Sequence, residues 1–514
     1  MLEFTIATRS GGRRLSTFLD ARIAEPEPGS RVVYPSRRWS PALKNAAVLI
    51  MGAATIGAIG ACGDAPTEVE EPPPSVTTAE VVSAGGPIFR TLAVALESAA
   101  AIAVDYWTTD SPRLQIASPT VSAEHRVFLP RLRPESRYDY EVYALSEAGV
   151  RGQPYADQFV TDSLPPELAA LEFYTIGSPT HPLTLVEVRS PTWYVVVDGD
   201  GEVVWYWPDQ AEADGGFTRL ANGDFVFLKD QGLAVISPQR QLIAELLQVR
   251  AHHDVIQASS GNTVLFLAQD DTVVTDTLWA GESIWEWNPA TGELAKRWTS
   301  FDFLSPEIDR GPRSRPTDWL HGNSLAIGPR GNVLLSLFWL RQVISIAADY
   351  ESLEWRLGGP GTTFQVEDGA MAGGQHTASE VSPGRILVFD NGADRPDGPI
   401  DRPEGTSYSR ALEIELDVDA GTARVAWEFR PRPDILAPVT SAARRLDNGN
   451  TFVTFGTAPG IPALSAGFGA ATGPIAVYEV TATNRIVWFM RVDGPANMYR
   501  ATPLTSIAGE KAVR

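Results

Sequence analysis

Short hydrophobic runs that alternate with polar residues follow one another from about residue 77 to the end of the chain. Alternation over a few residues is typical of a strand with one face in a core and the other in water. Residues 77–165 contain about seven such runs, and this density predicts a small β-sandwich. Examples of these runs are Leu92–Leu96, Ala101–Trp107 and Tyr138–Ala144.

From residue 167 onward the pattern repeats. One repeated signal is a turn glycine followed by a hydrophobic strand, which is typical of a hairpin, and it occurs at Gly223, Gly261, Gly331, Gly384 and Gly449. The second signal is a strand that ends near a tryptophan, and it occurs at Trp205, Trp298, Trp355, Trp427 and Trp488. A degenerate copy of the second signal, Leu242–Leu246, falls between the first two.

The six copies lie far enough apart for each to hold four strands and their loops. A sequence period of this length predicts a β-propeller. We therefore expect an all-β protein in which a six-bladed β-propeller, residues 167–505, follows the small β-sandwich at residues 77–165. The first copy lacks a glycine turn of its own, so we expect residues 498–502 to supply a strand that closes the ring.

Three of the six histidines, His253, His321 and His376, stand eight to ten residues before a turn glycine. The first strand of a propeller blade lines the central channel, so residues at matched repeat positions are expected to face one axis. The corresponding residues of two other copies, Gly215 and Ser441, are small. Three imidazoles could hold a divalent metal, bind an anion, or combine one nucleophile with two charge-stabilising partners, and their spacing does not decide between these.

Composition narrows the range of partners. The chain carries 42 basic and 63 acidic residues, a net charge of −21, and so acidic a surface repels nucleic acid. The single cysteine, Cys62, excludes an intrachain disulfide.

The N-terminus has the pattern of an export signal. Arg37, Arg38 and Lys44 precede the apolar run 46–59, and small residues then lead to Cys62. Residues 1–62 resemble a bacterial lipoprotein signal, which implies lipidation of Cys62 and an exported, cell-envelope protein in the periplasm or at the outer membrane. A plain transmembrane anchor is the alternative, but the run is short for a span. Residues 63–76 are predicted to form an acidic, proline-rich linker.

Several segments are similar to a known family. Asp318–Ser324 reads Asp-Trp-Leu-His-Gly-Asn-Ser, and Gln375-His376 is followed by Phe389-Asp-Asn-Gly392. Together with Trp355–Gly359 and Arg445–Thr451, these segments resemble the bacterial arylsulfotransferase family over residues 167–505. The resemblance implies a six-bladed propeller behind an N-terminal β-domain. Within that N-terminal part, Leu132-x-Pro-x-x-x-Tyr-x-Tyr140 resembles a fibronectin type III domain, whose tyrosines are expected to be core and corner residues.

The same resemblance implies a reaction. The family moves a sulfuryl group from a small aryl sulfate donor to a phenolic acceptor without a nucleotide or metal, and no cofactor is expected here. By the matching motifs, His376 is the histidine that is transiently sulfated, which gives ping-pong kinetics. His253 and His321 match the pair that holds the sulfate oxygens and assists proton transfer. Asn323 and Trp319 are expected to bind substrate, and Trp339 is a second candidate for stacking on the aryl ring.

The chain departs from the family at one position. Phe338 stands where the family has a sulfate-binding arginine. Arg341, three residues on, is the first candidate to replace it. Arg356 is the second, although an ion pair at a blade edge suits it better.

Two other functions remain open from the sequence. A non-catalytic propeller scaffold or ligand-binding lipoprotein is favoured by Trp287–Trp298, which resembles the repeats of quinoprotein-like propellers, but it gives no reason for the histidines. A metal-dependent hydrolase or lyase would use the three histidines as ligands.

Overall fold

The computed structural model describes residues 72–189, 193–208, 215–393, 408–457, 471–494 and 497–513. The predicted signal, Cys62 and most of the predicted linker lie outside these residues. The regular secondary structure of the described residues is nearly all strand. It includes one short α-helix, α1 (Pro166–Ala169), and one 3-10 helix, Ser300–Asp302. The predicted all-β fold is confirmed. No helix in these ranges is both long and apolar enough to cross a membrane.

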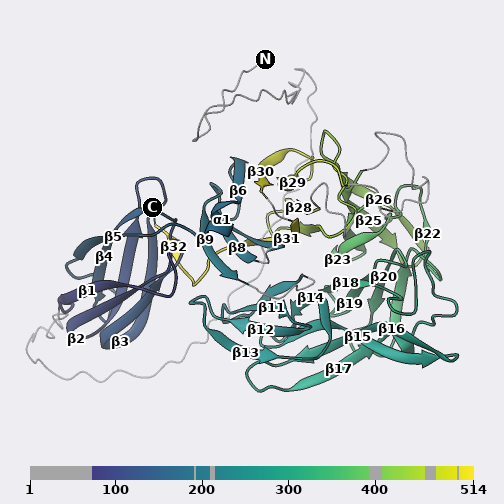
Figure 1. Cartoon of the computed structure of the whole chain (residues 1–514), viewed down its shortest axis with the longest axis horizontal. Coiled ribbons are helices and arrows are strands. Elements are labelled where there is room, and N and C mark those ends of the chain that lie inside the picture. Colours follow the sequence, from purple (N-terminus) through teal and green to yellow (C-terminus); the bar gives the residue numbers. More distant parts are fainter. Residues whose placement is uncertain are drawn as a thin grey trace, which may run out of the picture. The chain divides into compact units, whose positions relative to one another are not determined.

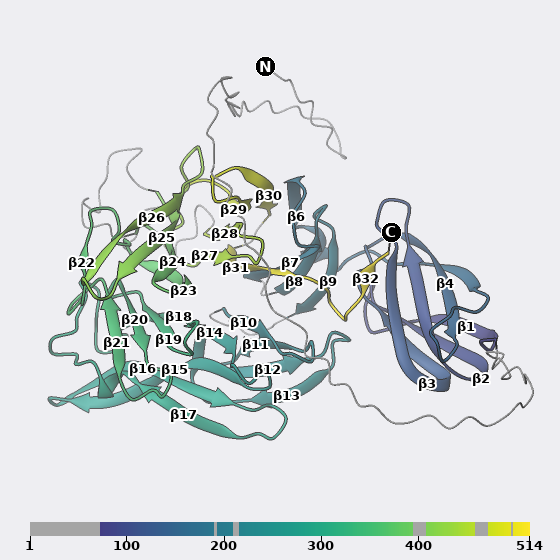
Figure 2. The ribbon, with the colours of Figure 1, turned by 180° about the vertical axis from the view of Figure 1, so that it is seen from behind.

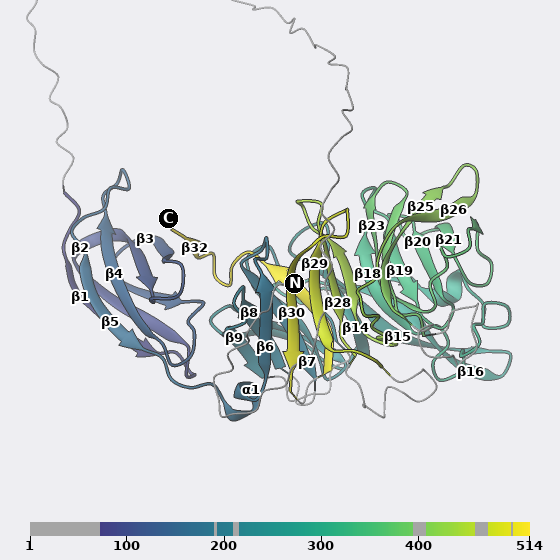
Figure 3. The same ribbon diagram turned by 90° about the horizontal axis from the view of Figure 1, so that it is seen from above.

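The N-terminal strands form one six-stranded sheet whose strands pair in two ways (Figures 1 and 3). Its strands are β1 (Val76–Ser83), β2 (Arg90–Trp107), β3 (Leu114–Leu129), β4 (Arg137–Leu145), β5 (Tyr155–Val160) and the C-terminal β32 (Lys511–Ala512). The first half of β2 pairs with β1 and with the second half of β3. The second half of β2 pairs with the first half of β3 and with β4.

The structure has fewer separate strands here than the sequence analysis expects. The runs Leu92–Leu96 and Ala101–Trp107 belong to one strand, β2, whose pairing with β3 shifts register between Ala95 and Ile102. Glu97, Ser98 and Ala99, between the runs, are exposed and stay extended, so the polar break shifts the pairing of the strand without ending it. Tyr138 and Tyr140 are buried, and the Tyr138 hydroxyl accepts a hydrogen bond from the Arg133 N–H at 2.8 Å. Both tyrosines are therefore core residues, as expected.

Six further sheets of four or five strands occupy the described residues from 172 onward (Figure 2). The strands of the first three sheets, in order of pairing, are β31 (Asn497–Leu504), β7 (Leu183–Arg189), β8 (Trp193–Asp198) and β9 (Val203–Pro208); β10 (Phe217–Arg219), β11 (Phe225–Lys229), β12 (Gly232–Ile236) and β13 (Leu242–Leu246); and β14 (Ala251–Gln257), β15 (Val264–Val274), β16 (Thr277–Trp287) and β17 (Leu294–Thr299).

The strands of the other three sheets are β18 (Gly322–Ile327), β19 (Val333–Leu337), β20 (Gln342–Ile346) and β21 (Leu353–Leu357); β23 (Gln375–Ser382), β24 (Arg385–Asp390), β25 (Arg410–Asp417), β26 (Thr422–Phe429) and the short parallel β22 (Gln365–Val366); and β27 (Ala442–Arg445), β28 (Thr451–Phe455), β29 (Ile475–Val480), β30 (Ile486–Asp493) and β6 (Glu172–Gly177). The repeated tryptophans lie on the fourth strand of their sheets, in β9, β17, β21, β26 and β30.

The first strands of successive sheets lie beside one another. β10 contacts β14, β14 contacts β18, β18 contacts β23, and β23 contacts β27. This succession, visible in Figure 2, gives the propeller-like arrangement that the sequence period predicts. Two segments from opposite ends of the repeated region join its sheets, because β31 pairs with β7 and β6 pairs with β30. Residues 498–502, expected to supply a closing strand, lie within β31.

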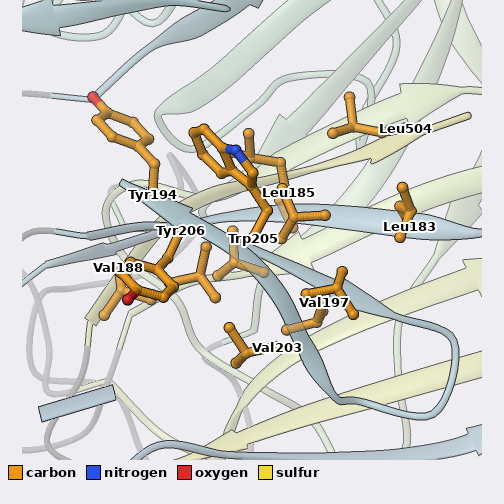
Figure 4. Close-up of a cluster of buried hydrophobic side chains, with 14 of the residues drawn as sticks. Leu183, Leu185, Val188, Tyr194, Val197, Val203, Trp205, Tyr206 and Leu504 are labelled. Carbon is orange, nitrogen blue, oxygen red and sulfur yellow. The ribbon is translucent and has the colours of Figure 1, made fainter. Parts of the chain in front are cut away.

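Aromatic side chains fill the core between the first two sheets (Figure 4). Trp205 on β9 is fully buried, and its indole Nε1 donates to the Pro238 carbonyl at 2.9 Å. The ring of Tyr194 on β8 stacks on Phe227 of the next sheet with 3.9 Å between ring centroids. The sheets therefore pack through large apolar side chains, which alternate positions of the strands direct into the core.

Replacement of Trp205 by alanine tests this packing. Trp205→Ala is expected to lower the free energy of unfolding by about 3–5 kcal/mol, because it leaves a cavity and removes a buried hydrogen bond. Ile243→Ala on β13, whose side chain is 54% exposed, is the control and should change it by less than about 0.5 kcal/mol. Urea unfolding followed by circular dichroism measures both, and equal effects would contradict the packing described.

Candidate functional site

Three histidines from three successive sheets meet in space. His253 lies in β14, His321 directly precedes β18, and His376 lies in β23. The rings of His253 and His321 are 4.8 Å apart between centroids. The Phe338 ring lies 5.7 Å from His321 and 5.1 Å from His376, so it joins the two. The structure thus brings together the three histidines that the sequence singles out.

Their repeat positions are not all equivalent. Counting back eight residues from each turn glycine reaches His253 in β14, Asn323 in β18 and His376 in β23. His321 stands two residues before Asn323, outside the strand. The expectation that three histidines share one repeat position is therefore wrong for His321, which reaches the cluster from the loop that precedes β18.

The pairing of β14, β18 and β23 with their neighbouring strands is irregular near the histidines. Register shifts occur between Ala251 and Val255 in β14, between Gly322 and Ser324 in β18, and between His376 and Ala378 in β23. His253, His321 and Thr377 adopt positive φ angles of 58°, 53° and 47°. Such angles are unfavourable for non-glycine residues and often mark bulges or functional sites, and here they turn side chains out of the regular alternation.

Hydrogen bonds between neighbouring sheets hold these irregular segments. The Asp254 carboxylate accepts from the Leu325 N–H at 2.8 Å. The Ser324 hydroxyl accepts from the Ala378 N–H at 3.1 Å, and the Thr377 hydroxyl accepts from the Ala443 N–H at 3.0 Å. Asp254, Ser324 and Thr377 each follow the position eight residues before the turn glycine. The same type of contact, from a side chain of one sheet to a backbone N–H of the next sheet, therefore recurs at all three sheets.

Asn391 fixes the tautomer of His376. The Asn391 side-chain NH₂ donates to the carbonyls of Ala437 and Thr440, at 2.8 and 3.0 Å. Its Oδ1 therefore faces His376, whose Nδ1 lies 2.7 Å away and must donate. Nε2 then carries the ring's lone pair. Burial lowers the pKa of His376 to about 3, with smaller contributions from the charges of His321, Arg500 and Arg189, so the ring is neutral near pH 7.

His321 has a carboxylate partner. Its Nδ1 lies 3.0 Å from Asp318 Oδ2, which also accepts from the indole of Trp339 at 2.7 Å. Burial opposes ionisation of Asp318, but hydrogen bonds from His321 and Trp339 and the charge of His321 hold its pKa below the ordinary value. The Trp339 ring lies 4.6 Å from His321, between centroids. A carboxylate that orients one ring nitrogen leaves the other free for proton transfer.

His253 has a histidine partner. Its Nδ1 lies 2.9 Å from the Nδ1 of His252, whose Nε2 lies 3.1 Å from the Glu282 carboxylate. Burial lowers the pKa of His253 well below its ordinary value, and the charges of His321, His252, His376 and Arg189 lower it further. His253 therefore stays neutral near pH 7.

The other residues expected at the site differ in placement. Trp319 is fully buried in a core, where its indole donates to the Asp309 carbonyl at 2.6 Å, so it is not placed to bind a substrate. Asn323 is also fully buried and donates to the Gln375 carbonyl at 2.7 Å. Arg341 lies in the turn between β19 and β20, with a φ of 51°. Arg356 forms an ion pair with Asp309 at 2.5 Å, in agreement with the ion-pair role that the sequence favours for it.

Two arginines that the sequence analysis missed lie against the cluster. Arg500 on β31 donates to Asp254 at 2.6 Å and to the Asn323 carbonyl at 2.8 Å. Arg189, at the end of β7, stacks on Tyr499 with 4.6 Å between its guanidinium carbon and the ring centroid. Tyr499 lies about equally far from His253 and His376, at 6.4 and 6.3 Å. The expected closing strand at 498–502 was the one sequence signal for Arg500, and none indicated Arg189.

The described residues contain no group of three or more His, Cys, Asp or Glu side chains arranged to hold a metal ion. The cluster instead combines imidazoles, of which His253 and His376 are neutral, with buried guanidinium groups. Such a set can bind an anion and offer it a nucleophilic nitrogen.

Comparison with known sequences matches the chain to a protein family and to a curated protein. The sequence model of the arylsulfotransferase (ASST) family matches residues 172–487. A curated relative, the arylsulfate sulfotransferase AssT of Escherichia coli O6:H1, is 34% identical over 86 residues, which make up 16% of this chain and 14% of that protein. The match therefore spans a small part of the relative.

Two of the solved structures to which the chain is similar have low sequence identity to it. A protein of unknown function from Bacteroides caccae is 13% identical, with a TM-score of 0.40 over 65% of this chain and 99% of that chain. AztD from Citrobacter koseri is 10% identical, with a TM-score of 0.30 over 78% of this chain and 98% of that chain.

The lowered pKa of His376 predicts an acid dependence of stability. The unfolded chain binds a proton at this histidine below pH about 6.5, whereas the native protein does not until pH about 3. His376 therefore makes the free energy of unfolding decrease as the pH is lowered through this window, by up to about 1.4 kcal/mol per pH unit. His376→Gln should flatten that dependence in urea unfolding between pH 7.5 and 4.5. An unchanged slope would show that native His376 titrates normally.

Proposed function

Because the chain belongs to the arylsulfotransferase family, we propose that it moves a sulfuryl group from an aryl sulfate to a phenolic acceptor, through a sulfated histidine. The observation that carries this proposal is the hydrogen bond from His376 Nδ1 to Asn391 Oδ1 at 2.7 Å. It leaves the lone pair of a neutral ring on Nε2, which is what a nitrogen nucleophile needs.

The first half-reaction transfers the group to the protein. His376 Nε2 attacks the sulfur atom, an Nε2–S bond forms, and the bond from sulfur to the aryl oxygen breaks with its electron pair on that oxygen. The sulfated ring keeps its Nδ1 proton and becomes cationic, and the Asn391 oxygen that accepts this proton stabilises the charge. His321, whose Nδ1 lies 3.0 Å from Asp318 Oδ2, acts as the acid that gives a proton to the departing phenolate.

The second half-reaction reverses these steps with a new phenol. Neutral His321 takes the proton of the acceptor, whose oxygen attacks sulfur, and the S–Nε2 bond breaks with its electrons on nitrogen. His376 and His321 return to their starting states, so the cycle balances without metal or nucleotide. The two half-reactions share one site, which predicts ping-pong kinetics.

His253 suits the role of a donor to a sulfate oxygen. His252, whose Nε2 lies 3.1 Å from the Glu282 carboxylate, can donate from Nδ1 to the Nδ1 of His253. The proton of neutral His253 then resides on Nε2, where it can meet an equatorial oxygen of the transferring group. Fixed donors at such oxygens stabilise a transition state in which charge spreads over them, as in phosphoryl transfer.

The surrounding architecture is part of the proposal. We infer that the six sheets from β6 to β31 are six propeller blades, a reading supported by their matched first-strand contacts. We infer that β1–β5 form a fibronectin type III-like sandwich, supported by the two-way pairing of β2 and β3 and by the Tyr138 hydrogen bond. We propose export and lipid anchoring through Cys62 on the sequence pattern alone. With these assignments, we propose that the protein is an enzyme of the cell envelope.

Release of 4-nitrophenol from its sulfate ester tests the function. Wild-type protein should release 4-nitrophenol only when an acceptor phenol is present, with parallel lines in double-reciprocal plots. His376→Ala should lower kcat by at least about a thousandfold, because the covalent route is lost. His125→Gln, which removes a histidine bonded within the N-terminal strands, is the control and should keep the wild-type rate.

Three outcomes would contradict the proposal. Release that does not depend on the acceptor would indicate hydrolysis. A His376→Ala variant that retains the wild-type rate would exclude the sulfated intermediate. A wild-type protein inactive with every aryl sulfate and phenol tested would favour a binding or scaffold role.

A further inference from the structure

The position of the family's sulfate-binding arginine is apolar in this protein. Phe338 is buried, and its ring lies against both His321 and His376. A transferring sulfuryl group is anionic, and charge-assisted hydrogen bonds from a guanidinium are among the strongest that a protein can offer to it. The site therefore needs another cation.

Arg189 approaches the histidines from a different sheet. Its guanidinium carbon lies 4.6 Å from the centroid of the Tyr499 ring, and this ring lies 6.3 Å from His376. Burial is the main reason that the pKa values of His253 and His376 are low, and the positive charge of Arg189 lowers both further. Arg189 therefore acts electrostatically on the nucleophile and on its partner.

The donors of Arg189 are not used by the protein. Its Nε and Nη2 atoms are buried and have no hydrogen-bond partner within the described ranges. The hydroxyl of Tyr499, which is 2% exposed, also lacks a partner there. A buried N–H group without an acceptor costs about 1–3 kcal/mol, and more when it is charged. An anion between Arg189 and the histidines would remove this cost.

Two neighbouring charged groups, Arg500 and Glu187, have other partners. Arg500 donates through Nη1 to Asp254 and through Nη2 to the Asn323 carbonyl, which leaves only Nε free of a partner among the described residues. Glu187, two residues before Arg189 on β7, accepts from the Gly216 N–H at 3.1 Å and forms no ion pair in the described part of the chain. Burial raises the pKa of Glu187 to about 7, so this carboxyl neutralises Arg189 only in part.

We propose that Arg189, backed by the ring of Tyr499, is the cation that binds the sulfate oxygens in place of the arginine that Phe338 replaces. This inference rests on the proposed function and adds to it the residue that holds the donor. Its ligand class is a sulfate monoester or free sulfate. A guanidinium that stacks on an aromatic ring keeps its N–H edge free for such an oxyanion.

Two measurements on Arg189 variants test this inference. Arg189→Gln should lower kcat/KM for 4-nitrophenyl sulfate by about a hundredfold or more, because a charged donor to the transition state is lost. Inorganic sulfate should raise the melting temperature of the wild type and of Arg189→Lys, which keeps the charge, more than that of Arg189→Gln. Arg240→Gln is the matched control, because Arg240 also stacks on aromatic rings, at Phe89 and Tyr206, away from the histidines. This control should keep the wild-type rate and sulfate response.

A second variant separates binding from folding. Phe338→Arg restores the family arginine, and in the Arg189→Gln background it should recover at least about tenfold of the lost kcat/KM. A purely structural role for Arg189 predicts no such recovery.

The outcomes distinguish this inference from the function on which it rests. An Arg189→Gln variant that keeps the wild-type sulfate stabilisation overturns the assignment of Arg189, whatever its activity. A wild type without sulfuryl transfer, whose stabilisation by sulfate nevertheless depends on Arg189, overturns the proposed function and leaves the anion site standing.

Discussion

The shift in register near the histidines in β14, β18 and β23 is the constraint on which the site depends. A regular strand would alternate its side chains between the two faces of the sheet, and every second backbone N–H of an edge strand points away from its own sheet. The N–H groups of Leu325, Ala378 and Ala443 donate to side chains of the preceding sheet. Each sheet thereby fixes the backbone of the next.

This arrangement has chemical consequences. Neutral imidazoles can be gathered tightly where imidazolium ions would repel, and burial keeps His253 and His376 neutral. Each ring of the cluster is oriented through one nitrogen, by Asn391, by Asp318 or by His252, so the other nitrogen is left to react or to bind. The partners come from the same sheets that hold the histidines, and the geometry of the site is therefore set by the fold.

The sequence predicted the features that repeat. Turn glycines such as Gly261 and fourth-strand tryptophans such as Trp488 are required in each copy by the same local geometry, so they located the sheets, His253 and His376. Features that occur once were harder to infer. His321 stands two residues farther from its turn glycine than the other histidines do, and the sequence pattern tolerates this difference. Only the strand pairing shows that Asn323 holds the shared position. Trp319 could not be separated from Trp339 by pattern, since the side of the chain that each faces depends on packing. Arg189 carries no motif, and its role follows from a stacking contact with a strand more than 300 residues away in sequence.

The central claim is that His376 Nε2 carries the sulfuryl group between donor and acceptor. The most direct measurement is the mass of the protein after mixing with an aryl sulfate in the absence of acceptor, followed by peptide mapping under conditions that preserve S–N bonds. We predict the addition of one sulfuryl group per chain, on the peptide that contains His376, and its loss when a phenol is added. An unmodified protein that nevertheless transfers sulfate, or a group found on another residue, would contradict the account.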